Sequence, residues 1–107
     1  MNWKILDNEA TLNKIIADSH EKPQAIFKHS TTCSISAAAK GRLDSNNSSN
    51  IDYYYLDLLN NRNLSNLIAE KFHVRHESPQ ILLIKNGNCT YHESHIGIRF
   101  ASVESEG

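Results

Sequence analysis

The chain has 107 residues and a formal net charge of −1 with neutral histidines, which suits a single domain (1–107) and excludes a basic surface for nucleic acid or an anionic membrane. No apolar run could span a bilayer, and residues 1–7 lack the apolar stretch of a secretory signal, so we expect a cytoplasmic protein. The two cysteines, Cys33 and Cys89, make no disulfide framework, and a reducing compartment would keep both as thiols.

The N-terminal half predicts a helix, a strand and a second helix. Asp7 suits the N-cap of the first helix, which Lys22-Pro23 closes off. Residues Gln24–His29 predict a strand that is buried at positions 25–27. The second helix follows Cys33, and its apolar positions fall on one face: Ile35, Ala38, Ala39 and Leu43.

The C-terminal half predicts a strand, a helix and a hairpin. Residues 51–56 contain three consecutive tyrosines and predict a strand. Asn60 or Asn63 would cap a third helix, whose apolar stripe is Leu64, Leu67, Ile68 and Phe72. Residues 81–84 predict a buried strand, which the Asn86-Gly87 turn joins to a return strand at 89–96.

A last short helix at 98–105 completes the order α-β-α-β-α-β-β-α. Strands that are joined through helices should lie parallel, and the hairpin adds an antiparallel strand. We therefore expect an α/β sandwich with a mixed four-stranded sheet and about four helices.

Cys33 is the candidate reactive residue because it stands where a strand passes into a helix. The unpaired amide hydrogens of a first helical turn, together with the helix dipole, favour a thiolate over a thiol. Ser36 stands three residues later, where a dithiol redox protein would carry its second cysteine. The motif is thus C-x-x-S, with a thiol that can attack a disulfide and no partner one turn away.

Several polar neighbours are candidates for stabilising the thiolate. The hydroxyls of Thr32, Ser34 and Ser36 could each donate to the sulfur. Lys28 and His29 could add positive potential, but strand alternation points them to opposite faces, so we expect one of them to contribute and select Lys28.

Cys89 is a poor candidate for the resolving thiol. It follows the Asn86-Gly87 turn, on the order of 20 Å along the strand from the end of the sheet where Cys33 is expected. A disulfide needs α-carbons within roughly 7 Å.

Two segments resemble the signatures of a known family. Residues 27–36 (FKHSTTCSIS) and 74–80 (VRHESPQ) resemble those of the bacilliredoxin C (YtxJ-like) group, monothiol proteins of the bacillithiol system with a thioredoxin-like fold. The similarity covers roughly residues 3–97. The group's motif usually has proline after the cysteine, whereas this chain has Ser34, which restores an amide donor and adds a hydroxyl.

The resemblance implies a cytoplasmic thiol–disulfide oxidoreductase that removes bacillithiol from S-bacillithiolated client proteins. Cys33 would attack the mixed disulfide and take the bacillithiol onto itself, with bacillithiol as exchanged thiol and no tightly bound cofactor. In thioredoxin-like proteins a cis proline faces the active cysteine. Ser78 and Pro79 match that place, so the resemblance implies a substrate-binding role for both.

Gly97 and Arg99 are further candidates for substrate binding. The return strand should bring His95, Ile96 and Gly97 close to Cys33 and Pro79. Gly97 would permit close approach of a ligand, and the amides of Ile98 and Arg99 would open a helix N-terminus suited to the carboxylates of bacillithiol.

No metal site is expected. The chain has neither C-x-x-C nor H-E-x-x-H spacing, and the pair His73 and His76 is a weak signal on its own.

Two alternatives stay open. One is a monothiol glutaredoxin-like carrier that holds an iron–sulfur cluster between subunits, which would be brown after anaerobic purification. The other is a thioredoxin-like adaptor with an inert cysteine, which would react with iodoacetamide only above about pH 8.

Overall fold

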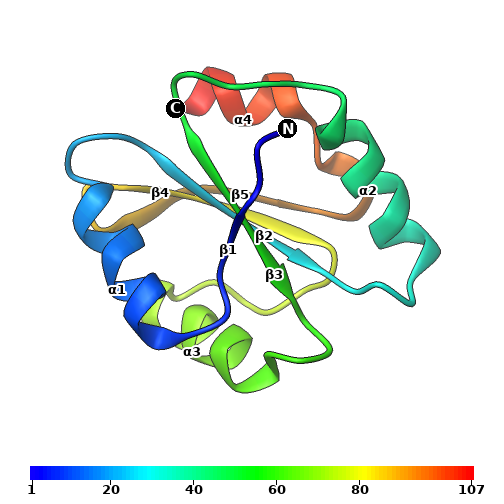
Figure 1. The fold of residues 1–107 in the computed structure, drawn as a ribbon, viewed down its shortest axis with the longest axis horizontal. Coiled ribbons are helices and arrows are strands. Elements are labelled where there is room, and N and C mark those ends of the chain that lie inside the picture. Colours follow the sequence, from blue (N-terminus) through cyan, green and yellow to red (C-terminus); the bar gives the residue numbers. More distant parts are fainter.

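A mixed five-stranded sheet forms the centre of the protein (Figure 1). The computed structural model describes all 107 residues. In chain order the elements are β1 (Lys4–Ile5), α1 (Glu9–Asp18), β2 (Gln24–His29), α2 (Ser34–Asp44), β3 (Asp52–Asp57), α3 (Arg62–Phe72), β4 (Gln80–Lys85), β5 (Asn88–Ser94), the 3₁₀ helix η1 (His95–Gly97) and α4 (Phe100–Glu106). The strand order is β1-β3-β2-β4-β5. β1, β2 and β3 are parallel to one another, and β4 is antiparallel to both of its neighbours, β2 and β5.

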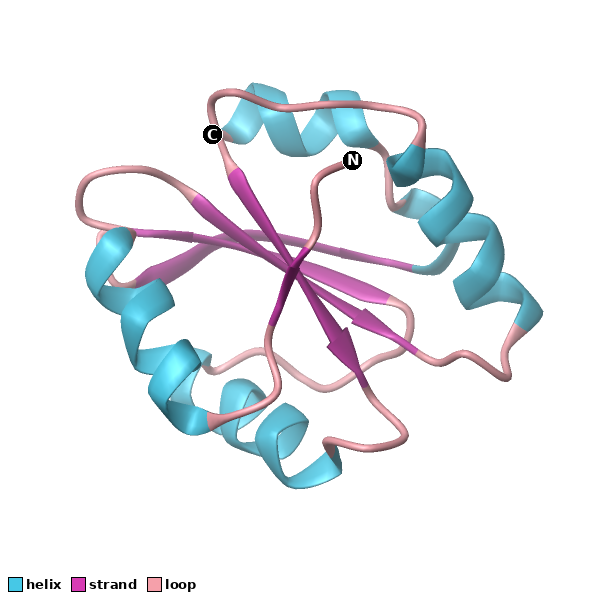
Figure 2. Cartoon of the chain, viewed as in Figure 1, coloured by secondary structure: helices cyan, strands magenta, loops and turns pink.

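The helices form two layers, one on each face of the sheet (Figures 1 and 2). On one face, α1 and α3 contribute Leu12, Ile15 and Ile68 to a core with the strand residues Ile26 and Leu82. On the other face, Leu43 of α2 and Val103 of α4 pack against Phe27 and Leu83. The predicted α/β sandwich is confirmed, and it has the thioredoxin-like architecture. None of the helices has both the length and the apolar character needed to cross a membrane.

β2 is the central strand, and all six of its residues are buried. Its side chains alternate between the two cores, with Ile26 toward α1 and α3 and Phe27 toward α2 and α4. Lys28 and His29 at its end therefore lie on opposite faces of the sheet, as predicted.

The sheet has one strand more than the four predicted. β1 contains only Lys4 and Ile5, both exposed, and it pairs with Tyr54 and Tyr55 of β3. A strand of two exposed residues leaves no alternation in the sequence from which it could be predicted.

The predicted helix caps were also wrong, by one or two positions. Asn8 caps α1, because its side-chain oxygen accepts the backbone amide hydrogen of Thr11. The Asp7 carboxylate instead accepts a hydrogen bond from the side-chain Nδ2 of Asn8. Asn61, not Asn60 or Asn63, is the N-cap residue of α3, and its side chain makes no capping bond.

The hairpin is confirmed, but its return strand is shorter than predicted. Asn86 and Gly87 have φ angles of 52° and 79°, as the turn requires. β5 ends at Ser94 rather than at Ile96, and η1 follows it. The last helix begins at Phe100, with Arg99 as its N-cap residue, rather than at Ile98.

Candidate functional site

Cys33 is the N-cap residue of α2, directly after the turn that leaves β2. Its backbone is extended (φ −107°, ψ 122°), its amide donates to Ser30 O at 3.2 Å, and its carbonyl accepts the first helical bond from Ala37 at 3.0 Å. The side chain is partly exposed and makes no capping hydrogen bond. The thiol therefore belongs to a partly exposed residue at the positive end of α2.

The buried face of α2 differs from the predicted one. Ile35 is 51% exposed and Ala38 is exposed, whereas Ser36 is fully buried with Ala39 and Leu43. Ser36 is buried because it has polar partners: its Oγ lies 2.6 Å from His29 Nδ1 and accepts the amide hydrogen of Ser30 at 3.0 Å. The hydroxyl thus ties the start of α2 to the end of β2, and none of its hydrogen bonds goes to the Cys33 sulfur.

His29 is held in an aromatic environment. Its ring stacks on Phe27 with centroids 5.7 Å apart and lies 5.5 Å from the ring of Tyr55. Burial lowers the pKa of the imidazole, and the positive charge of Lys40 lowers it further. A neutral ring is therefore the favoured partner of the Ser36 hydroxyl.

Lys28 does not point toward Cys33. Its amine is on the α3 face, where it donates to Ser65 O at 3.2 Å and lies 3.3 Å from His76 Nδ1. The other two polar candidates, Thr32 and Ser34, are both exposed; Thr32 Oγ1 lies 3.3 Å from Ser30 Oγ. None of these three side chains makes a hydrogen bond to the Cys33 sulfur.

The Ser78–Pro79 peptide bond is cis, as expected, and Pro79 is buried. It directly precedes Gln80, the register partner of Lys28, so it lies at the edge of the sheet where β2 ends and the Cys33 turn begins. The Ser78 hydroxyl is buried and has no hydrogen-bond partner.

η1 links this proline to α2. The amide of His95 donates to Pro79 O at 3.1 Å, and Arg42 of α2 donates to the carbonyls of His95 and Ile98, both at 3.0 Å. The corner around Gly97 thus lies beside the proline, as predicted, but its contact with α2 is at Arg42 in the last turn, at the other end of the helix from Cys33.

The corner itself is arranged differently from the anion site that was predicted. A Cβ on Gly97 would lie only 2.5 Å from Cδ of Glu93, so that carboxylate fills the space left by the missing side chain. The amide of Ile98 is already bonded to His95 O at 3.4 Å, and Ile98 is buried. Arg99 is exposed in front of α4 and is the one cationic side chain of the predicted set that remains free here.

Cys89 lies at the opposite end of the sheet from the Cys33 turn. It pairs with Ile84, four residues along β4 from Gln80, which is about 13 Å at the usual rise of a strand. Its Sγ lies 3.4 Å from Tyr91 O, and burial raises the pKa of the thiol. Both cysteines are free thiols.

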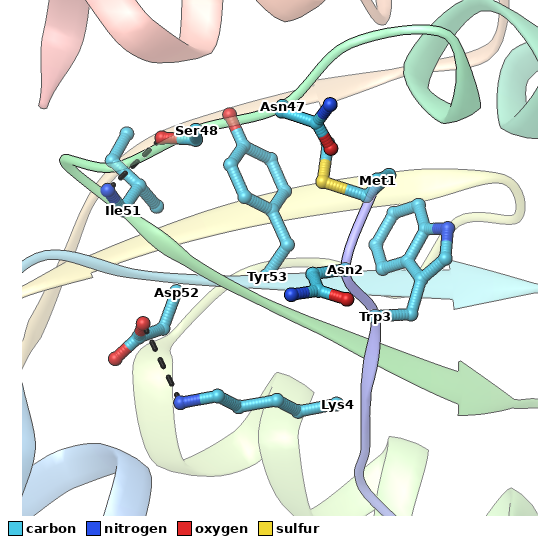
Figure 3. Close-up of a pocket in the computed structure, with 9 residues that line it drawn as sticks. All are labelled: Met1, Asn2, Trp3, Lys4, Asn47, Ser48, Ile51, Asp52 and Tyr53. Atoms are coloured by element: carbon cyan, nitrogen blue, oxygen red, sulfur yellow. Dashed lines mark hydrogen bonds and ion pairs between the residues drawn. The ribbon is translucent and has the colours of Figure 1, made fainter.

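The largest cavity, about 490 Å³, is also at the end of the sheet away from Cys33. Figure 3 shows that it lies between the N-terminal segment and the start of β3, with Lys4 Nζ 3.5 Å from Asp52 Oδ1. β2 and β3 are parallel, so this end of β3 is opposite to the end of β2 that carries the Cys33 turn. No cluster of three or more histidine, cysteine or carboxylate side chains is arranged to hold a metal ion.

Sequence reasoning missed four residues that shape this region. They are Arg42, Ser65, His76 and Glu93. Only His76 carried a signal, because it lies two residues before Ser78 within the segment that resembles a family signature. Arg42 and Ser65 act through contacts between elements that are distant in sequence, whereas Glu93 acts on Gly97 in the element that follows its own strand.

The comparisons with known proteins agree with this geometry. The family model of the monothiol bacilliredoxin BrxC matches residues 4–103. The chain belongs to the BrxC family. Its fold is similar to that of a protein described as a proposed oxidoreductase with a thioredoxin fold, at 32% identity and a TM-score of 0.84, covering 95% of this chain and 90% of that one.

Thioredoxins are more distant matches and show the fold alone. The thioredoxin of Fasciola hepatica is 15% identical, with a TM-score of 0.76 over 97% of this chain and 99% of that one. The short form of thioredoxin f from spinach chloroplast is 10% identical, with a TM-score of 0.72 over 96% and 91%. At the start of α2 this chain carries Cys33 and Ser36, one thiol and one hydroxyl.

Proposed function

We propose that this BrxC-family protein is a monothiol thiol–disulfide oxidoreductase that removes bacillithiol from S-bacillithiolated client proteins through a mixed disulfide on Cys33. One observation carries the proposal. A single, partly exposed thiol stands at the N-terminus of α2, at the same edge of the sheet as the cis Ser78–Pro79 bond, and Ser36 replaces a second thiol.

The reaction is a pair of thiol–disulfide exchanges. The Cys33 thiolate attacks the bacillithiol sulfur of the client's mixed disulfide, a new S–S bond forms, and the client cysteine leaves as a thiolate that takes up a proton. A second thiol, which we assign to free bacillithiol, then attacks the bacillithiol sulfur on Cys33. Oxidised bacillithiol leaves, and Cys33 returns to its thiolate. Overall, the client's mixed disulfide and one free bacillithiol become the client thiol and one molecule of oxidised bacillithiol, so the number of disulfide bonds does not change.

We assign the electrostatic support of the attacking and leaving sulfur to the start of α2, where Cys33 is the N-cap residue. Amide hydrogens of a first helical turn point along the helix axis toward the N-cap, where they can donate to an anionic sulfur. We assign a supporting role to the exposed hydroxyls of Thr32 and Ser34. Ser36 and Lys28 would act by holding the surrounding backbone, since their hydrogen bonds go elsewhere.

Substrate binding is assigned to the Ser78–Pro79 edge. The backbone of Ser78 would pair with the peptide or thiol that carries the disulfide, next to Cys33. Arg99, exposed in front of α4, would attract the carboxylates of bacillithiol. Gly97 would contribute indirectly by making room for Glu93. Cytoplasmic client proteins and bacillithiol are the proposed partners.

The proposal is tested by intact-mass measurement. The protein is incubated with oxidised bacillithiol, and the wild type is compared with Cys33→Ser and with the matched control Cys89→Ser. We expect a mass increase of one bacillithiol on the wild type and on Cys89→Ser, and none on Cys33→Ser. An unmodified wild type, or an adduct that persists in Cys33→Ser, would overturn the assignment.

A further inference from the structure

Lys28 is a buried ammonium group without a carboxylate partner. The whole residue is 0% exposed, and none of the ion pairs of the structure involves it. Its Nζ donates to Ser65 O at 3.2 Å and to His76 Nδ1 at 3.3 Å. The hydroxyl oxygen of Ser65 lies 3.1 Å from His76 Nδ1. A buried charge is kept at considerable cost, so these contacts need an explanation that packing alone does not give.

The contacts of Lys28 join three elements. The lysine belongs to β2, Ser65 to α3, and His76 to the segment 73–79 that connects α3 to β4. His76 lies two residues before Ser78, so the ammonium holds this segment just ahead of its cis bond.

A second buried side chain holds the same segment. Gln80 is the register partner of Lys28 across β2 and β4, so both side chains lie on the α3 face of the sheet. Its Nε2 donates to Arg75 O at 2.9 Å. The segment is thus fixed at Arg75 and His76 by two neighbouring strand residues.

We propose that Lys28 and His76 form a positioning pair that holds the segment 73–79 so that Ser78 and Pro79 face the disulfide on Cys33. This inference rests on the proposed function, because it assigns a role in substrate binding. It also replaces the expectation that Lys28 stabilises the thiolate directly. The Lys28 side chain is directed to the α3 face, whereas Cys33 begins α2, which packs on the other face.

The pair requires one protonation state. Nδ1 can accept from Lys28 only when the imidazole is neutral, with its hydrogen on Nε2. Burial lowers the pKa of His76, and the charges of Lys28 and Arg62 lower it further, while Glu77 opposes them. Burial also lowers the pKa of Lys28 to about 8. At neutral pH the lysine therefore donates and the histidine accepts, and protonation of His76 removes the acceptor.

The test compares variants that keep or remove this contact. Lys28→Met removes the donors at similar volume, His76→Leu removes the acceptor, and His76→Asn keeps an acceptor that cannot be protonated. Lys71→Met, an exposed lysine of α3, is the matched control. Three quantities are measured: hydrogen exchange of the amides at 74–78, kcat and KM for an S-bacillithiolated client, and the iodoacetamide alkylation rate of Cys33.

We expect Lys28→Met and His76→Leu to speed exchange at 74–78 and to raise KM about tenfold, with the alkylation rate of Cys33 within about twofold of the wild type. We also expect the wild-type KM to rise on acidification from pH 7.5 to pH 5.5, because protonation of His76 removes the acceptor. His76→Asn should keep the wild-type KM at pH 7.5 and should not show this rise. If Lys28→Met fails to fold, the comparison of His76→Leu with His76→Asn still tests the proposal.

Two results would overturn the proposal. An alkylation rate that falls as much as the transfer rate would show that Lys28 acts on the sulfur. Unchanged exchange at 74–78 in both Lys28→Met and His76→Leu would show that the pair does not hold the segment. Hydrogen exchange needs no substrate, so a wild type that fails to accept bacillithiol would refute the proposed function and leave this readout intact.

Discussion

Ser36 Oγ lies 2.6 Å from His29 Nδ1, in the helical position where a dithiol redox protein carries its second cysteine. The same oxygen accepts the Ser30 amide hydrogen at 3.0 Å, so its own hydrogen is available for the imidazole. In this chain the position therefore serves the junction between β2 and α2, and under the proposed function Cys33 would be the only thiol here that takes part in exchange.

Replacing Ser36 by alanine should destabilise the fold. The change leaves a buried imidazole nitrogen and the Ser30 amide without a partner, which typically costs about 1–3 kcal/mol. Urea denaturation followed by circular dichroism measures the loss. Ser34→Ala, an exposed hydroxyl two residues earlier, is the control and should stay within about 0.5 kcal/mol of the wild type. Equal midpoints for the two variants would contradict the role of Ser36.

Stability should decrease as the pH falls below about 6.5. Burial is the main cause that lowers the pKa of His29 and of His76 below the value of 6.5 found in an unfolded chain. Below that pH the unfolded chain binds protons that the folded chain resists, so the stabilisation is present above pH 6.5 and is lost on acidification. Urea midpoints between pH 7.5 and 5 measure this, with the exposed His20→Gln as control. A flat profile over that range would contradict the burial of neutral imidazoles.

Stability should rise between about pH 8 and 10 because of Lys28. Burial lowers the pKa of its amine from 10.5 to about 8, so in this range the unfolded chain holds a proton that the folded chain has released. The Cys89 thiol has the opposite effect, since burial raises its pKa. The measurement therefore uses urea midpoints in a Cys89→Ser background. The rise should disappear in Lys28→Met, and a rise of the same size in that variant would assign it to another group.

Much of this fold follows from local patterns in the sequence. The apolar run of β2, the Asn86-Gly87 turn and the stripe of α3 each predict their element, because period and turn chemistry are local properties. Cys33 could be picked out as a candidate from its place between a predicted strand and a predicted helix, whereas the candidate role of Pro79 came from the resemblance to a known family.

What could not be predicted depends on contacts between distant residues. Ser36 is buried and Ile35 exposed because His29 and Ser30 supply polar partners under α2, which hydrophobic periodicity cannot indicate. Lys28 likewise follows the alternation of β2 into a buried position, and its partners Ser65 and His76 come from other elements.

Gly97→Ala should be destabilising because of Glu93. The added Cβ would lie 2.5 Å from Glu93 Cδ, so the carboxylate must leave the position where it accepts the Ser94 amide at 2.9 Å. We expect a loss of less than about 1 kcal/mol for Gly97→Ala in the wild-type background, because the flexible Glu93 side chain can move, and a smaller loss in a Glu93→Ala background, because contacting residues couple. A double-mutant cycle by urea denaturation measures the coupling. Strictly additive losses would show that Gly97 is not there to make room for Glu93.

The central claim is that Cys33 alone carries the exchange, and the most direct measurement is the rate at which a bacillithiol-modified client protein is reduced, followed by mass spectrometry. With excess bacillithiol as second thiol, the wild type and Cys89→Ser should release the client thiol at equal rates and pass through a bacillithiol adduct on Cys33. Cys33→Ser should show only the uncatalysed rate. Release by Cys33→Ser at the wild-type rate, or loss of activity in Cys89→Ser, would contradict the account.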